Sequence, residues 1–519
     1  IGAGQDLKLY HNGNFSYIQD DGSSSLIVKC NGLQIKNQAD SEVFLQAFND
    51  GGVALYHDNN KKFESTSTGI SVTGGIVGSA DATINGLTVG KGANSVAQNT
   101  VLGVNALDAT VTGNFNTAIG YQALTDNTSG ASNLAVGRNS LANNTTGDSN
   151  TAVGANALNA NTTANENVAV GGSALSQCQT GTRNVAVGNN SLNNATGSYN
   201  VGVGFYTLKD QTSATQNTAV GYFALKANTA SNITALGYEA LTANTTGVEN
   251  VAVGSNALDA NTTGAHNTAT GRHSLSANTT GNDNTAFGKT ALRNNTTGSD
   301  NTAIGVNSLR NNTTANNNTA VGFESLKANT TGTKNVAIGG AVLDANTTAS
   351  NNTAVGYVAM TVNTTGADNS AFGEQALEVN TTGSGNTAIG RDALGANTTG
   401  GENVGVGNHA GKLITTGNRN TAVGSQAMIS GGGNASDNVA IGRMALKVIT
   451  SGNNNTIVGK GAAQNLTTGT MNTALGSDAL QQNTTASYNV AIGRVALAAN
   501  TTGTTNVAVG SFALDANTT

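Results

Sequence analysis

Apolar and polar residues follow one fixed pattern along most of this chain. One copy, residues 116–132, reads NTAIGYQALTDNTSGAS, and further copies follow one another from Asn99 to Thr519. The glycine that ends the first motif, here called the column glycine, recurs 25 times from Gly103 to Gly510, almost always with a 17-residue period. This period is too short for paired helices or for a leucine-rich repeat. It fits one coil of a β-solenoid, in which successive coils stack like residues above one another.

Three steps between column glycines differ in length, and all three changes fall in the polar half of the repeat. The steps that end at Gly204 and Gly237 are one position shorter than the others, and the step that ends at Gly442 is one position longer. Surface loops tolerate insertions better than the elements they connect. The polar half is therefore predicted to be the loop side of each coil.

Each copy predicts two short strands and a turn. The N-T-A-V-G segment alternates and is β-branched, x-A-L-x is a second candidate strand, and N-T-T-G supplies turn residues. The residue before the column glycine is apolar in all copies but one, and Leu stands four residues after the glycine in 21 of 25 copies. We expect the Leu column, from Leu107 onward, and the preceding Val/Ile column to face inward.

Asparagine and alanine hold two further fixed positions. Asn stands four residues before the column glycine in every copy except the one with Ile233. Stacked asparagines at a coil corner tolerate left-handed backbone and pass amide hydrogen bonds from coil to coil, so this column is interpreted as scaffold rather than ligand site. Alanine two before the glycine, in 21 copies, predicts a close approach of backbone across the coil or against a neighbouring chain.

The chain is predicted to be all-β and to consist of three parts. Residues 1–75 lack the period but contain short alternating segments parted by Gly, Asn and Asp, which predict a β-hairpin-rich region. Residues 76–98 are predicted to be a transition coil, and 99–519 to be about 25 tandem 17-residue coils of a β-solenoid or β-roll. Each coil offers few large apolar side chains, so we expect chains to share a core, most naturally as a parallel homotrimer.

Composition excludes several classes of protein. With 37% hydrophobic residues, 10% charged residues, no Trp and only 21 Phe plus Tyr, a large globular core is excluded. The absence of Pro fits continuous ladders. A net charge of −6 provides no basic footprint for nucleic acid. No apolar run is long enough to cross a bilayer as a helix, so no membrane insertion is expected.

Three stretches carry a resemblance to a known family. The opening DLKLYHNGNFSYIQDDG, the segment KKFESTSTGISVTG and the join GLTVGKGANSVAQNTVLG resemble tail-fibre proteins of marine bacteriophages, in which such hairpins precede NTAVGxxAL arrays. The array is also similar to the head repeats of trimeric autotransporter adhesins, which are left-handed parallel β-rolls whose three chains share a core. These resemblances imply a virion tail fibre that contacts other tail proteins. They also imply that a host receptor or polysaccharide is bound through a distal tip not in this chain.

Catalytic, cofactor and metal sites are not expected. Enzymes bring unlike groups together in one pocket, whereas a repeated coil offers the same groups at every level, and no phosphate-loop or metal-binding motif is present. The two cysteines lie in different regions and are interpreted as unpaired. For two of the histidines, trimer symmetry could bring three copies to one axis and bind a metal, with ordinary hairpin packing as the alternative. The two cysteines are Cys30 and Cys178, and the two histidines considered for a metal are His11 and His57. The remaining histidines are His266, His273 and His409.

Aromatic residues occur irregularly just after the column glycine. If exposed, they could stack on sugars of a host polysaccharide, and packing between coils is the alternative. They are Tyr121, Phe205, Tyr206, Tyr222, Phe223, Tyr238, Phe323, Tyr357 and Phe512.

The leading functional hypothesis is therefore a structural segment of a phage tail fibre, a stiff spacer that presents a host-binding tip, located in the virion. The first alternative is a bacterial trimeric surface adhesin on the cell surface. The second is an ice-binding solenoid, because threonine columns at a rung spacing of ~4.8 Å form a regular array. The turn threonines are interrupted by Ser129, Ala230 and Ala315, which argues against a flat face there.

Overall fold

The computed structural model contains almost no helix, and its chain divides into two units, residues 1–80 and 81–519. Each unit is described by itself. The structure describes all residues except 1–6, 21–25, 50, 74–80, 85 and 430–432.

The first unit consists of antiparallel hairpins, as its alternating segments predict. Strand β1 (Leu7–His11) pairs with β2 (Ser16–Asp20). A second hairpin, which joins residues 53–57 to residues 60–66, turns through Asp58 and Asn59, both with positive φ. A five-stranded sheet follows in chain order: β3 (Gly32–Lys36), β4 (Val43–Phe48), β5 (Val53–His57), β6 (Asn60–Thr66) and β7 (Gly69–Val72).

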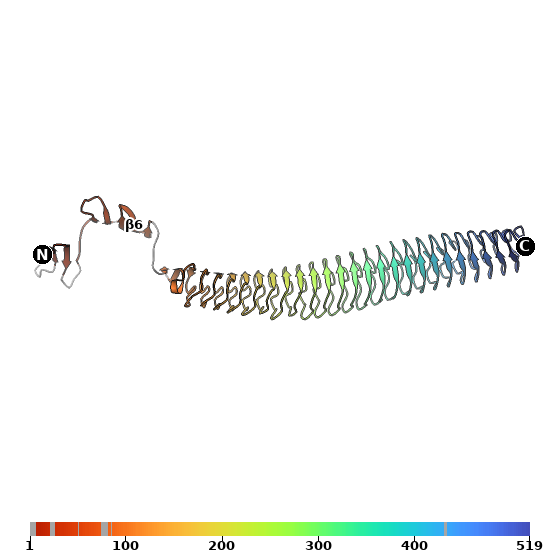
Figure 1. The fold of residues 1–519 in the computed structure, drawn as a ribbon, viewed down its shortest axis with the longest axis horizontal. Coiled ribbons are helices and arrows are strands. Elements are labelled where there is room, and N and C mark those ends of the chain that lie inside the picture. Colours follow the sequence, from red (N-terminus) through yellow and green to blue (C-terminus); the bar gives the residue numbers. More distant parts are fainter. Residues whose placement is uncertain (1–6, 21–25, 50, 74–80, 85, 430–432) are drawn as a thin grey trace. The chain divides into compact units, whose positions relative to one another are not determined.

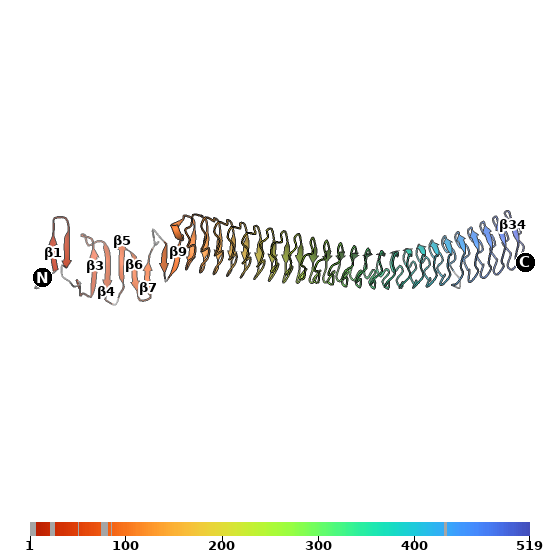
Figure 2. The ribbon, with the colours of Figure 1, turned by 90° about the horizontal axis from the view of Figure 1, so that it is seen from below.

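The second unit is a β-solenoid of 24 turns, joining 25 stacked strands from β10 (Thr100–Gly103) to β34 (Val507–Val509). Strands β11 to β34 each cover the three residues before a column glycine. They pair in parallel and in register, so Ala118 lies beside Ala135 and Ala135 beside Ala152. The parallel arrows follow one another along the array (Figures 1 and 2). The predicted all-β fold and 17-residue coil are confirmed.

Within the segment expected to be a transition coil, two short strands pair with each other. Strand β8 (Ala82–Ile84) pairs antiparallel with β9 (Leu87–Gly90), and β9 pairs antiparallel with β10. A short 3₁₀ turn, η1 (Ala93–Ser95), follows. The Asp81 carboxylate accepts hydrogen bonds from the backbone N–H groups of Lys91 and Gly92 at 2.7 and 2.6 Å. The first parallel strand of the solenoid is therefore seated on an antiparallel one.

The prediction that the Val/Ile column faces inward is wrong. In β11 (Thr117–Ile119) the middle residue, Ala118, is fully buried, while Thr117 and Ile119 are only partly buried. Successive side chains of a strand point to opposite faces, so a buried central alanine forces both flanking residues outward. The same burial pattern repeats in every strand from β11 to β34.

The x-A-L-x segment is a turn, so the predicted second strand is also wrong. Ala123 and Leu124 are adjacent and both have 0% exposure, which an extended strand cannot achieve because its side chains alternate. Left-handed backbone at Gln122 (φ 52°) and Leu124 (φ 55°) turns both side chains inside. The turn still pairs between coils, since the N–H of Leu124 donates to the carbonyl of Ser140 at 3.0 Å. The inward position predicted for the Leu column is confirmed.

Two buried columns of asparagine hold successive coils together. In the first column, which the sequence predicts, the Asn133 side-chain oxygen accepts from the backbone N–H of Asn150 at 2.9 Å, and the Asn133 amide donates to the carbonyl of Gly147 at 2.8 Å. The second column lies eleven residues further along each coil, where Asn144 donates to the Asn127 oxygen at 2.8 Å. The predicted scaffold role is confirmed, but the left-handed residue is the one that precedes each first-column asparagine, such as Ser132 (φ 59°).

The column glycine allows adjacent coils to approach closely. At Gly137, φ is 135°, and an added Cβ would lie 2.6 Å from the carbonyl oxygen of Gly154 in the next coil. Neither the backbone conformation nor the spacing admits a side chain. Glycine at this position therefore follows from both requirements.

Candidate functional surfaces

The most regular exposed surface of the array is the outward face of its strands. We call it the outer strip and define it as the residues three before and one before each column glycine. The residue three before each column glycine, here called the inner column, is Thr, Val, Leu or Ser. The residue one before the glycine, here called the outer column, is apolar except at Thr270. None of these 50 positions holds a charged residue. The more exposed side chains of the strip include Phe287, Ile389 and Leu475, at 57%, 44% and 49%, and many of the others are partly exposed.

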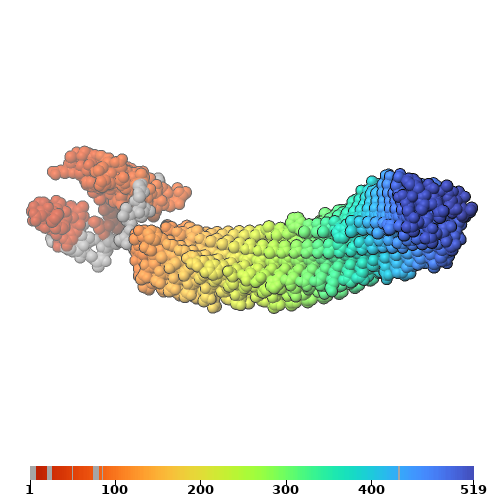
Figure 3. Space-filling view, turned by 45° about the vertical axis from the view of Figure 1, so that its right-hand side comes forward, coloured from red at the N-terminus to blue at the C-terminus, as the bar shows by residue number. Residues whose placement is uncertain are grey.

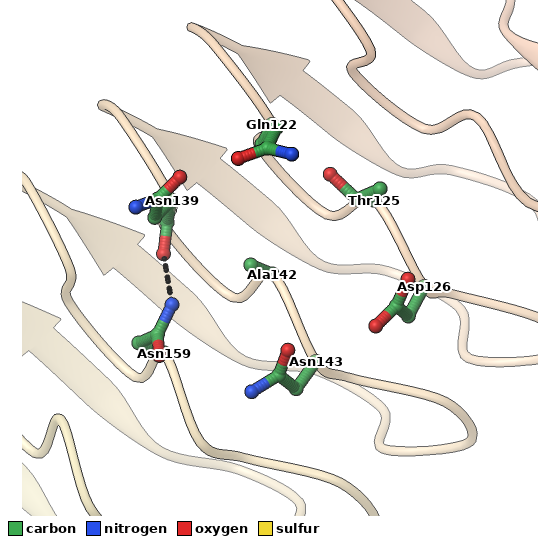
Figure 4. A pocket seen from close by; sticks show the side chains of 7 residues that line it. All are labelled: Gln122, Thr125, Asp126, Asn139, Ala142, Asn143 and Asn159. Atoms are coloured by element: carbon green, nitrogen blue, oxygen red, sulfur yellow. Dashed lines mark hydrogen bonds between the residues drawn. The ribbon is translucent and has the colours of Figure 1, made fainter.

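A shallow polar pocket of about 200 Å³ opens beside the turns of the first coils. Asn159 donates from its amide to the backbone carbonyl of Asn139 at 3.1 Å (Figure 4), and Asn139 donates to the oxygen of Asn156 at 3.2 Å. The lining can exchange hydrogen bonds, but Asp126 is its one ionisable side chain, so it provides no acid–base pair. The lining residues are Gln122, Thr125, Asp126, Asn139, Ala142, Asn143 and Asn159.

Five of the nine aromatic residues form one ladder across three coils. The rings of Phe205 and Tyr222 stack with centroids 5.5 Å apart, and those of Tyr222 and Tyr238 with centroids 5.4 Å apart. Tyr206 and Phe223 pack edge to face beside them at 5.6 Å. Because the rings cover one another's faces, packing between coils accounts for these five. The other four lie singly, at Tyr121, Phe323, Tyr357 and Phe512, with exposed fractions of 49 to 65%.

Stacking gives two histidines carboxylate neighbours that sequence inspection missed. His266 lies 3.8 Å from Glu249 in the preceding coil and 3.3 Å from Asp283 in the following coil. His409 Nδ1 lies 3.2 Å from the nearly buried Asp392. The signal was present, because Glu249, His266 and Asp283 occupy the same position in three successive repeats. Comparison of equivalent positions in successive repeats, rather than of residues adjacent in the sequence, identifies these neighbours.

A third histidine lies beside an acidic residue whose pKa is raised. Burial raises the pKa of Asp259, whose side chain lies 3.5 Å from the Asn256 amide. Burial, together with the nearby Arg272 and Arg293, lowers the pKa of His273. Among the residues that the structure describes, no group of three His, Cys, Asp or Glu side chains is arranged to hold a metal ion.

The remaining sequence candidates lie apart from one another. His11 Nδ1 is 3.3 Å from the Ser16 hydroxyl, and His57 is 3.4 Å from Asp58. Cys30 is exposed, whereas Cys178 is buried in the second asparagine column and donates to the carbonyl of Gly181 at 3.3 Å. The two cysteines are both free thiols. Whether three copies of His11 or His57 meet on an axis stays a hypothesis.

The first threonine of each N-T-T turn that is followed by another coil does not present a free hydroxyl. Thr128 donates its side-chain hydroxyl to the carbonyl of Thr145 at 3.0 Å, and Thr145 donates to the carbonyl of Thr162 at 3.0 Å. These hydroxyls therefore join successive coils. The threonines that face outward without this bond pattern lie in the outer strip, such as Thr117 and Thr151, and at the second position of the turn, such as Thr146 and Thr314.

Comparison of the chain with protein-family models, with curated protein sequences and with solved structures found no match. Among the described residues, no helix has the length and hydropathy needed to cross a bilayer.

Proposed function

We propose that this chain is a structural segment of a bacteriophage tail fibre, a spacer that holds a host-binding tip away from the virion. The observation that carries the proposal is the uniform interior of the array. From coil to coil the same alanine, leucine and asparagine positions are buried, so the sequence specifies length and continuity. The resemblance of the hairpins and the join to tail-fibre proteins supplies the context.

The surfaces support positioning rather than chemistry. The polar pocket offers hydrogen-bonding groups and one carboxylate, the ion pair of His266 lies on exposed side chains, and that of His409 involves the nearly buried Asp392. A nucleophile with an adjacent base would be needed for covalent catalysis. The spacer therefore acts through its partners, which are other virion tail proteins and a tip that recognises a receptor or polysaccharide on the host.

The first unit supports assembly from several copies. Ala54 is the one buried residue among the described apolar side chains of this unit. Sheets that expose this much apolar surface require a partner, and a parallel homotrimer would provide two. Its most exposed apolar side chains are Leu9, Phe15, Ile18, Ile27, Val28 and Ile70, at 61 to 73%.

Antibodies raised against residues 99–519 test the proposed location. Immuno-electron microscopy of phage particles that carry this chain should show the antibody along the tail fibres, and uninfected host cells should remain unlabelled. Label on the surface of uninfected bacteria would instead support the adhesin hypothesis and reject the tail-fibre proposal. A chain deleted for residues 99–519 is the matched specificity control.

A further inference from the structure

The outer strip lacks charge at all of its positions, as the exposed turn threonines such as Thr146 and Thr314 also do, but its side chains are mostly apolar. The column just before the first asparagine ladder, for comparison, contains Glu166, Arg183, Glu249 and Asp283. A solvated face of a repeat protein accumulates charged residues freely, because such positions contribute little to packing. The absence of charge from all 25 rungs of the strip therefore requires a physical reason.

The area of the strip is that of a protein interface. With 24 steps of ~4.8 Å it extends roughly 115 Å, and with a width of about 10 Å it covers on the order of 1,000 Å². Monomeric proteins rarely expose contiguous apolar patches larger than a few hundred Å², and a stable interface buries about 800 Å² on each partner. The space-filling view shows side chains aligned in rows along the array (Figure 3).

We infer that the outer strip is the surface through which copies of this chain associate along the array. A second copy has the same rung spacing, so its rows of β-branched side chains can interdigitate over the full length, which a partner without this repeat cannot match. Identical parallel faces also place like residues opposite one another. Charge on the strip would therefore repel itself, and a neutral strip avoids this cost.

The first unit provides a second reason to choose copies of the chain as the occupant. Its exposed apolar side chains require association there, and the same chain continues into the array. Copies tethered through one region meet at high effective concentration in the next. The inference thus rests on the multi-chain fibre proposed above and adds the surface on which the arrays meet.

Two large side chains argue against an ice lattice as the occupant. Binding to ice needs a face of uniform height, whereas Phe287 and Phe372 project from the outer column with exposed fractions of 57% and 41% among valines and isoleucines. A second copy can accommodate such residues by local repacking. Ice shaping is accordingly an outcome of the test below.

The test uses the accessibility of a reporter thiol on the strip of the full chain. Cys30→Ser removes the exposed native thiol, and Ile338→Cys places the reporter on the outer column, where Ile338 is 39% exposed in one chain. Val321→Glu with Val355→Glu adds charge on the two adjacent rungs of the strip. The matched control, Asn317→Glu with Asn351→Glu, adds the same charge in the same two coils, in the column that already holds Glu249.

We expect maleimide to label the reporter at least tenfold faster in the protein with Val321→Glu and Val355→Glu than in the other two. Those two are the reporter protein without added charge and the control protein with Asn317→Glu and Asn351→Glu. Nearby glutamates raise the pKa of a thiol and slow its reaction, so faster labelling reports exposure. Protection of Cys178 in all variants verifies that the coils stay folded. Equal labelling rates in all three proteins would overturn the inference, as would a monomeric chain that shapes ice crystals. Neither result depends on where antibodies place the chain in the virion.

Discussion

At the scale of single residues, each coil depends on a strained leucine and a buried asparagine. The leucines of the Leu column have φ between 48° and 55°, a conformation that costs roughly 1–2 kcal/mol for a residue with a Cβ. Complete burial of the side chain offsets this with roughly 1.5–3 kcal/mol. Where the column has Gly411 or Ala463, Ile414 or Leu466 replaces the second-column asparagine and is buried in its place. The two columns thus fill one shared space.

Removal of a ladder asparagine should destabilise its coil. Asn301→Ala removes the acceptor of the Asn318 N–H at 3.1 Å, whereas the carbonyl of Ala315 keeps the Asn312 amide as a donor at 3.0 Å. One buried unpaired group costs about 1–3 kcal/mol, so we expect the local opening free energy to fall by roughly that amount. Hydrogen exchange of peptides that span this coil measures it. The exposed Thr314→Ala in the same coil should change the opening energy by less than about 0.5 kcal/mol, and equal effects would reject the ladder.

The two cysteines should react differently with thiol reagents. Burial raises the pKa of Cys178 to about 11, so its thiol stays protonated, and closed off from reagent, well above neutral pH. Cys30 is exposed. Quantitative labelling with a maleimide at pH 7 should modify one thiol per folded chain and two in denaturant. Rapid labelling of Cys178 in the folded chain would mean that the second column is open to solvent.

At the scale of the element, the sequence predicts the period, the number of coils and both constant small positions, but not which strand face is buried. Hydrophobicity alone predicts that the valine, isoleucine and leucine side chains of the strand face the interior. Ala118 shows why that fails, since alanine fits the interior beside Leu124, and the larger Ile457 is buried in this column where Ala463 replaces the leucine of its coil. The adjacent pair Ala123–Leu124 indicates a turn, because in a coil with a single interior an extended strand turns only one of two successive side chains inward.

Paired leucine substitutions test the orientation of a strand. Ala152, the central residue of β13 (Thr151–Val153), has 0% exposure, whereas Ala155 in the same coil is exposed. Ala152→Leu should overpack the interior and destabilise the coil by roughly 1–3 kcal/mol. Ala155→Leu adds the same atoms at a position that elsewhere holds Phe205 or Tyr222, and it should be nearly neutral. Hydrogen exchange of the coil compares the two; a larger loss for Ala155→Leu would invert the assigned faces.

At the scale of the whole molecule, stacking creates neighbours that lie one repeat apart in the sequence. Each coil of the array contacts the coils before and after it, so stability is close to a sum over coils and their interfaces. The groups around His266 and the outer strip both arise from this stacking. Alignment of the repeats by position predicts the groups around His266. Prediction of the outer strip also requires the orientation of the strand, which hydrophobicity alone assigns wrongly. The first unit has no repeat, so its hairpins are predictable from alternation, but its partners are not.

The assembly should be a homotrimer. Sedimentation or light scattering of the full chain should give three times the 51.6 kDa mass of one chain. In a single chain the apolar side chains of the first unit and of the outer strip stay exposed to solvent, and association of three copies would bury them. The mass should persist on dilution to micromolar concentration. A folded monomer under these conditions would refute association through either surface.

The claim that coil number sets fibre length is tested most directly by whole-coil deletions viewed by electron microscopy. Residues 301–385 are five successive 17-residue coils and residues 250–419 are ten, and either cut restores the same stacking surface. The account predicts folded arrays shortened by roughly 24 and 48 Å, in proportion to the coils removed. Arrays that unfold when whole coils are removed, or fibres whose length does not change, would contradict it.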